Sequence, residues 1–379
     1  MTSLLVQGGD TLLADGSVRR ADVRTDGSLI TAVGEPDATD TTTLDATGAL
    51  VLPGIIDVHG DAFERAIMPR PGVVMTVERA LAETRPQLLA AGITTAFVSV
   101  TDGWEPGLRS RARLRALLEA VTSTSARSRP PRLEVHVRHE CCNTDDLDEL
   151  VGWIENRVVK LLSYNDHTPG GIKLVTGLSD VRVQRSGVSR DELQRLQDQA
   201  IERRPEGQAQ QRQLAETARA VGVVTASHDA DDAEDLARDL ELGVGFAEFP
   251  TSIALAGEYR THGIPVLLGA PNLVRGGSHL GNLSVGDAWE AGVVDMLCSD
   301  YHYPSLLLAP FSLVERGATL GDAWATVSAT PARVAGLSDR GRIEPGRSAD
   351  LVVVEPPTDG EDARVRAVVV DGQVAMLSP

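Results

Sequence analysis

Two kinds of hydrophobic pattern divide the chain. At both ends, short apolar runs alternate with turn residues, as in LLVQGGDTLL near the start and RAVVVDGQVAML near the end. Such runs, bounded by glycine and aspartate, are typical of short antiparallel strands. Neither end is large enough to form a stable sheet alone. We therefore expect residues 1–50 and 340–379 to pair into one composite β-sandwich domain.

Between these ends, over residues 51–339, the pattern becomes apolar strand, polar tip and helix, repeated. The candidate strands are residues 51–58, 93–100, 133–140, 158–166, 223–229, 244–250, 264–270 and 294–300. Eight strands separated by helices predict an α/β fold, a (β/α)₈ barrel of the TIM type. A charged, glutamine-rich stretch near 177–222 predicts a helical insertion, either part of a lid or a solvated helix pair.

Polar side chains gather at the predicted carboxyl ends of the strands, where barrels of this type build their active sites. They are His59, Asp61, Glu140, His167, His228, Glu248, Asn272 and Asp300. In the stretch DVHGD, alternation along a strand would place His59 and Asp61 on one face. Two buried ligand side chains on one face are costly unless a cation lies between them.

Histidines and carboxylates at one barrel mouth predict a divalent metal site with one or two ions. The predicted ligands are His59, Asp61, Glu140, His167, His228 and Asp300. Asp166 is an alternative to His167, and Glu140 is the preferred bridge between two ions. Imidazole ligands favour zinc, while manganese or magnesium would also suit the carboxylates. Bound metal lowers the pKa of its water towards ~7, and Asp300 is the predicted catalytic base.

Composition narrows the class of protein. The 379 residues carry a net charge of −18, which argues against nucleic-acid and anionic-membrane partners. No stretch approaches the ~18 apolar residues of a membrane span, and the N-terminus lacks a signal-peptide pattern. The three cysteines form no disulfide framework and fit a reducing compartment. We expect a cytoplasmic enzyme with a small-molecule substrate, and the sequence leaves open whether it is a monomer or a homo-oligomer.

Several motifs are similar to those of the amidohydrolase superfamily: LPGIIDVHGD, ASHD at 226–229, and the closing GRIEPGRSADLVV. Most members carry His-x-His where this chain has His59 and Asp61. The longer runs DHTPG and GAPNLVRGGSHLGN resemble a narrower branch, the diphosphatases of the carbon–phosphorus lyase pathway of phosphonate metabolism. The resemblance implies metal-dependent hydrolysis of alpha-D-ribose 1-methylphosphonate 5-triphosphate to the 5-phosphate and pyrophosphate.

A triphosphate substrate needs positive charge, and the chain has only two lysines, Lys160 and Lys173. Arginine therefore supplies most of it, and its planar guanidinium suits phosphate oxygens. We expect phosphate contacts from Arg70, after the first strand, and from Arg275 in the glycine-rich loop after the seventh. Neighbouring residues of that loop complete the predicted substrate contacts: Asn272, Ser278 and His279.

Two other functions remain open at this point. Fold analogy alone would favour a metal-dependent amidohydrolase or deaminase that acts on a cyclic amide or nucleobase-like substrate. A non-catalytic binding subunit of a phosphonate-processing assembly is the third reading. The amidohydrolase or deaminase reading predicts that Arg70 and Arg275 are dispensable. The binding-subunit reading predicts that metal removal has no effect.

Overall fold

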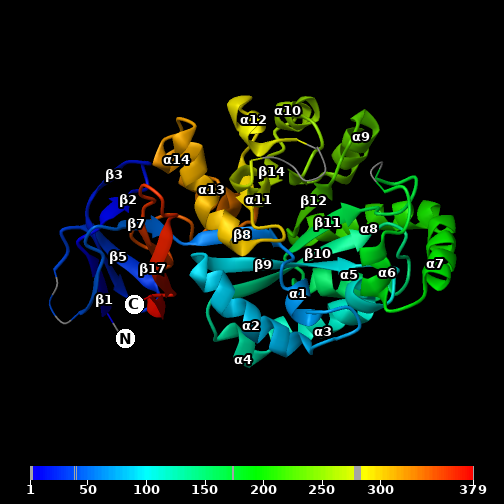
Figure 1. The fold of residues 1–379 in the computed structure, drawn as a ribbon, viewed down its shortest axis with the longest axis horizontal. Helices are drawn as coiled ribbons and strands as arrows, with labels where there is room; N and C mark the ends of the chain where they lie inside the picture. Colours follow the sequence, from blue (N-terminus) through cyan, green and yellow to red (C-terminus); the bar gives the residue numbers. More distant parts are fainter. Residues whose placement is uncertain (1–2, 38, 40, 173–174, 277–282, 379) are drawn as a thin grey trace.

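Eight parallel strands form a nearly closed barrel in the computed structural model, which describes residues 3–378 except 38, 40, 173, 174 and 277–282 (Figure 1). The barrel strands are β8 (Ile55–Gly60), β9 (Ile93–Asp102), β10 (Arg132–Glu140), β11 (Leu161–Asn165), β12 (Val224–His228), β13 (Phe246–Glu248), β14 (Val266–Gly269) and β15 (Met296–Cys298). The ring closes where Asp61 N–H donates to the Asp300 carbonyl and Asp300 N–H donates to the His59 carbonyl, both at 2.9 Å. The predicted (β/α)₈ fold is confirmed.

Helices surround this barrel and connect its strands. They are α1 (Glu64–Ile67), α2 (Val77–Ala90), α3 (Arg111–Thr122), α4 (Thr124–Arg127), α5 (Leu147–Glu155), α6 (Asp180–Ser186), α7 (Arg190–Glu202), α8 (Arg204–Val221), α9 (Ala233–Leu242), α10 (Ile253–Thr261), α11 (Ala270–Val274), α12 (Val285–Glu290), α13 (Tyr303–Glu315), α14 (Leu320–Ala325) and α15 (Ala329–Val334), with a 3₁₀ turn at Gly107–Arg109. Side chains such as Thr76 and Ser110 accept a hydrogen bond from the first turn, which fixes where α2 and α3 begin.

Two further sheets come from the ends of the chain and lie beside the barrel, with both termini on that side (Figure 1). One is β5 (Leu29–Gly34), β4 (Asp22–Asp26), β1 (Ser3–Gln7) and β6 (Thr42–Asp45); the other is β18 (Gln373–Leu377), β17 (Arg364–Val370), β16 (Leu351–Glu355), β7 (Leu50–Pro53), β2 (Asp10–Leu12) and β3 (Val18–Arg20). β7 pairs with β16, so the two ends share one sheet as predicted. The strands are not all antiparallel, however, because β1–β6 and β2–β7 are parallel.

The predicted first strand, residues 51–58, is in fact two strands. β7 belongs to the end sheets and β8 to the barrel, and Gly54 lies between them. A Cβ atom at Gly54 would lie 2.2 Å from the Thr94 hydroxyl, so the change of direction needs a residue without a side chain. An apolar run alone does not show this break. The domain limits at residues 50 and 340 stay a prediction, and β7 already extends past the first.

We expect Gly54→Ala to destabilise the fold by about 2 kcal/mol, because the added methyl overpacks against buried Thr94. Gly152→Ala is the matched control, since Gly152 lies inside α5 with nothing within 4 Å of its would-be Cβ. That change should be neutral or stabilising by up to ~1 kcal/mol. Thermal unfolding of both variants at one scan rate tests the pair, and equal melting temperatures would contradict it.

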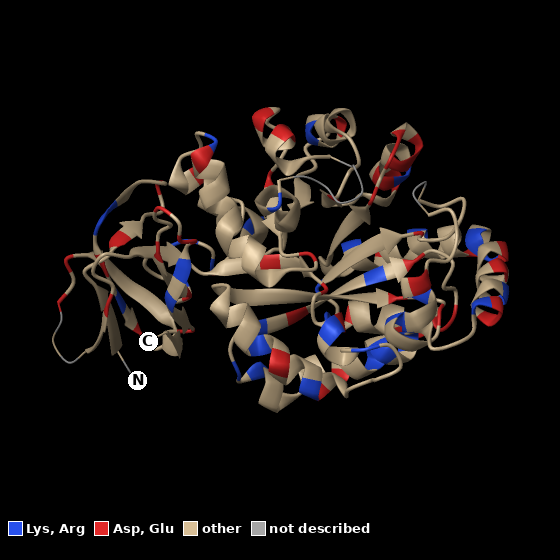
Figure 2. Cartoon of the chain, viewed as in Figure 1, with Lys and Arg blue, Asp and Glu red and all other residues tan. Residues whose placement is uncertain are grey.

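The predicted insertion forms the three helices α6, α7 and α8. Acidic and basic residues alternate along α7, on the side of the barrel far from the end sheets (Figure 2). Its buried residues are few, which fits a solvated face; α6, in contrast, borders a pocket beside the barrel mouth. Within the described residues, no helix is long and apolar enough to cross a membrane.

Candidate active site

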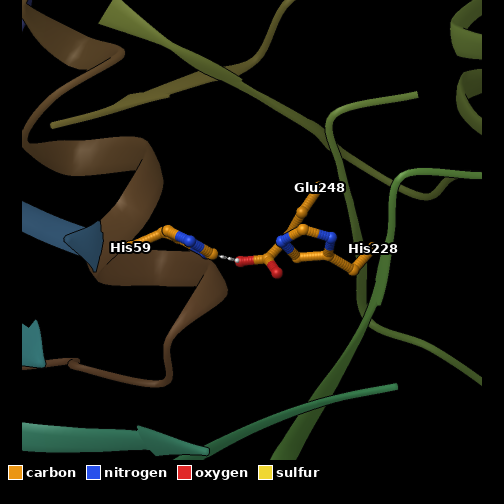
Figure 3. Close-up of side chains that lie close together, drawn as sticks. All are labelled: His59, His228 and Glu248. Carbon is orange, nitrogen blue, oxygen red and sulfur yellow. Dashed lines mark hydrogen bonds and ion pairs between the residues drawn. The ribbon is translucent and has the colours of Figure 1, made fainter. Parts of the chain in front are cut away.

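Three side chains from three strands converge at the carboxyl end of the barrel. His59 from β8, His228 from β12 and Glu248 from β13 offer ligand atoms that all lie within 4.8 Å of one another (Figure 3). Nδ1 of His59 lies 2.8 Å from Oε1 of Glu248, and the His59 and His228 ring centroids are 5.5 Å apart. All three side chains are buried. This geometry matches a compact site for one cation.

The protonation of this group suits a divalent metal. Burial lowers the pKa of His59 to about 3 and that of His228 to about 4, so both rings are neutral near pH 7. Metal ligation requires neutral imidazole. Burial raises the pKa of Glu248, whose Oε2 has no hydrogen-bond partner among the described residues. An unpaired buried carboxylate oxygen is costly without a cation, so these residues fit the metal that the fold implies.

A second group shares His228 and adds His167 and Asp229. Oδ2 of Asp229 lies 3.1 Å from Nδ1 of His228 and 3.5 Å from Nε2 of His167. The His167 backbone N–H donates to Oε2 of Glu140 at 2.8 Å, and Nδ1 of the His167 ring lies 2.5 Å from Oε1 of Glu140. Burial lowers the pKa of His167, but the charge of Glu140 outweighs it and raises that pKa to about 9.

These contacts bear on two open choices. His167 faces the cluster, whereas Asp166 accepts a hydrogen bond from Arg204 Nε at 2.8 Å on the side of α8. The structure therefore favours His167 over Asp166 as the inward residue. Glu140 bonds to His167 and belongs to neither ligand group found among the described residues. Its role as a bridge between two ions stays a prediction.

Arg138 links Asp61 to the histidines. Its Nη2 donates to Nε2 of His228 at 3.0 Å, and its Nη1 lies 3.3 Å from Oδ2 of Asp61. Neutral His228 must then carry its proton on Nδ1, towards Asp229. A ligand bond from Nε2 requires the Arg138 guanidinium to move aside. Asp61 thus reaches the cluster through Arg138 and belongs to neither ligand group.

Asp300 lies where the barrel closes, next to the His59 backbone. Burial, then the charge of Asp61, raises the pKa of Asp300 to about 7. Its backbone is left-handed, with φ at 52°. Oδ2 lies 3.2 Å from the position that a Cβ on Gly269 would take, so glycine leaves room for the carboxylate. A group that exchanges a proton near neutral pH suits a general base.

A buried carboxylate that sequence reasoning missed supports this closure. Asp57 accepts hydrogen bonds from the Ser299 backbone N–H at 3.0 Å and from its hydroxyl at 2.5 Å. Burial raises the pKa of Asp57 to about 6. These bonds hold the segment that carries Asp300 against β8. Asp57 is therefore a positioning residue for the barrel mouth.

The residues predicted to contact the substrate come from different parts of the chain. Arg70 is exposed in the loop after α1, and Arg275 is exposed at the end of α11. Asn272, half-buried in α11, has an Oδ1 without a partner among the residues described. Ser278 and His279 lie outside the described residues, as does Lys173. Lys160 precedes β11 and borders a hollow beside Arg132 at the start of β10, opposite the metal ligands.

The alternation of side chains along a strand correctly predicts which face some of the site residues occupy, but not all of them. It placed Arg138 and Glu140 inside the barrel and His139 outside, where His139 contacts Asp102. It does not explain His59, because Ile56 and Val58 already face the barrel interior. A register irregularity between Asp57 and Gly60 turns His59 inward.

Glu248 and Asp229 were not among the predicted ligands. Both had a signal in the sequence. Glu248 ends a short apolar run in the same way as His228, and Asp229 follows His228 directly in ASHD.

Known proteins are similar to this chain in sequence and in fold. A model of the amidohydrolase family matches residues 309–376. The chain is 31% identical over 319 residues, 82% of its length, to the alpha-D-ribose 1-methylphosphonate 5-triphosphate diphosphatase of Escherichia coli K12, of which it covers 84%. A shorter segment of 58 residues is 47% identical to a dihydroorotase of Bacillus subtilis 168, covering 15% of this chain and 14% of that protein.

Solved structures show the same fold. A triazine hydrolase from Arthobacter aurescens superimposes with a TM-score of 0.64 at 16% identity, covering 99% of this chain and 94% of the other. A dihydropyrimidinase from Brevibacillus agri gives 0.59 at 17% identity, covering 98% and 95%. The (β/α)₈ barrel, the ligand groups at its mouth and the long match to the diphosphatase lead to one conclusion: the chain is a hydrolase that belongs to the amidohydrolase superfamily.

Proposed function

We propose that this enzyme hydrolyses alpha-D-ribose 1-methylphosphonate 5-triphosphate to the 5-phosphate and pyrophosphate, in phosphonate catabolism by the carbon–phosphorus lyase pathway. The observation that carries the proposal is the pair of ligand groups that share His228 at the barrel mouth, in a chain 31% identical to a diphosphatase of that substrate. The bond broken is a phosphoanhydride. The pathway would place the enzyme in the cytoplasm.

The metal would be held first by His59, His228 and Glu248. A second ion would be held by His167 with Asp229, for which His167 would have to give up the proton that Glu140 stabilises. Asp61, Glu140 and Asp300 remain proposed ligands from their places around these groups. Imidazole favours zinc, and manganese or magnesium are alternatives. When bound, the metal polarises a phosphoryl oxygen and lowers the pKa of its water.

The protein's own residues then move the proton and balance the charge. As the water oxygen bonds to phosphorus, the Asp300 carboxylate takes the water proton. The bond from phosphorus to the oxygen of the leaving pyrophosphate breaks at the same centre. Arginines offset the charge that grows on this leaving group. Arg70 and Arg275, with Asn272, Ser278 and His279, are the proposed phosphate contacts.

Phosphorus NMR tests the reaction directly. Zinc-loaded protein incubated with ribose 1-methylphosphonate 5-triphosphate should release pyrophosphate and the 5-phosphate, and protein treated with a chelator should not. An unchanged spectrum from folded, zinc-loaded protein would rule out the diphosphatase. The next substrates to test would then be cyclic amides, which the short match to a dihydroorotase suggests.

A further inference from the structure

A pocket of about 500 Å³ opens beside the second ligand group. Its walls come from the segment after β9 and from the start of the helical insertion. Its lining includes Trp104, Arg109, Glu140, His167, Arg182 and Arg185. Its volume falls in the range of small-molecule sites, roughly 300–1,000 Å³. Neither Arg70 nor Arg275 lines it.

Arginine dominates the charge of this pocket. Three arginines line it against the carboxylates Glu105 and Glu140, in a chain whose net charge is −18. Arg109 is held by Glu64, with Nε to Oε1 at 2.9 Å and Nη2 to Oε2 at 3.0 Å. Arg109 is paired with Glu64 and Arg182 with Glu105, so Arg185 is the arginine of this pocket that favours an anionic ligand.

Two of the arginines stand on one face of α6. Arg182 is fixed, since its Nε donates to Glu105 at 2.5 Å and its Nη1 donates to the His167 carbonyl at 2.6 Å. Arg185 is looser: its side chain is 36% exposed, and its Nη2 lies 3.8 Å from Glu64. That distance is too long for a hydrogen bond. Among the described residues, Arg185 therefore keeps donors available for a ligand.

The remaining wall is partly apolar. The Arg182 guanidinium lies 4.8 Å from the centre of the Trp104 ring, and Val181, which precedes Arg182 on α6, is 54% exposed. Thr101 is 3% exposed, and its hydroxyl has no partner among the residues described here. The pocket thus combines guanidinium donors, one unpaired hydroxyl and a small apolar surface. A simple inorganic phosphate would use only the first two.

We propose that this pocket binds the phosphonate end of the substrate, the sugar-linked group with a negatively charged oxygen and a small alkyl substituent. The inference rests on the proposed function, because the metal groups would hold the triphosphate end. Arg185 contacts the phosphonate oxygen, and Trp104 with Val181 contacts the methyl group. Arg182 keeps the wall in place.

Calorimetric titration of the zinc-loaded protein tests this binding without hydrolysis. The two probes are ribose 1-methylphosphonate 5-phosphate and ribose 5-phosphate. The first should bind at least about tenfold more tightly, which is the size of one good charge-assisted contact. In Arg185→Gln the preference should fall below about threefold, and Arg185→Lys should restore part of it.

The matched control is Arg195→Gln, the same change at an exposed arginine on α7 that pairs with Glu192. It should keep the wild-type preference. Equal affinity of the wild-type protein for both probes would overturn the inference, and so would a preference that Arg185→Gln leaves intact. Failure of the diphosphatase reaction would appear in the NMR experiment and leave this binding result unaffected, so the two failures are separable.

Discussion

Replacing Asp300 with asparagine is expected to lower kcat for pyrophosphate release by about 1,000-fold, the size of a lost general base. Asparagine keeps the volume of Asp300 and tolerates its left-handed backbone, where φ is 52°. Alanine would add backbone strain to the chemical change. Since burial raises the pKa of this carboxyl to about 7, removing its charge should cost little stability. Steady-state release of pyrophosphate and thermal unfolding measure the two effects.

Asp371→Asn is the control for this substitution. Asp371 also has a left-handed backbone, with φ at 47°, but it lies exposed in the turn between β17 and β18. The same chemical change there should leave turnover within about twofold of wild type, as for most exposed positions. A loss below tenfold in Asp300→Asn, or an equal loss in both variants, would contradict the role of Asp300 as base.

Replacing His228 with glutamine should produce the largest change in metal content. His228 is shared by both ligand groups, so its loss weakens each of them. Even contacts behind the ligands are worth about 10–100-fold in affinity, and a shared ligand should exceed that. We expect bound zinc to fall at least tenfold after dialysis, together with activity. Elemental analysis by mass spectrometry gives the metal content.

His59→Gln and His262→Gln complete this experiment. His59 belongs to one group only, so its variant should retain the metal of the other group if two ions bind. His262 follows α10 and is exposed, so that variant should match wild type. Unchanged zinc content in His228→Gln would contradict the proposed metal site, because neither ligand group could then bind the zinc.

The sequence predicted the barrel well because each strand is a buried apolar run that ends in a polar tip. It misplaced the start, since β7 and β8 read as one apolar run and only the packing of Gly54 on Thr94 separates them. The mixed pairing of the end sheets was also beyond the pattern. Which strands become neighbours depends on the path of the chain, not on periodicity.

The sequence also predicts the site only in part, because contacts made across the barrel do not follow from periodicity. His59 and His228 could be predicted because each follows apolar strand residues at the mouth. Arg138 could be placed on the inner face, but its partners depend on how far its long side chain reaches across the barrel. Two of the three pocket arginines, Arg182 and Arg185, come from the helical insertion, so nearness in sequence to the first strand favoured Arg70 instead. Tertiary folding alone brings Arg182 beside His167.

The pairing of β7 with β16 has a consequence for synthesis of the protein on the ribosome. β7 emerges early, but its partner strand emerges about 300 residues later. Synthesis adds about 5–20 residues per second, so the apolar edge of β7 stays unpaired for roughly 15–60 s before β16 is made. Unpaired strand edges promote aggregation during that interval. A premature stop codon before β16 would therefore leave every barrel strand intact and still yield an insoluble, chaperone-bound product.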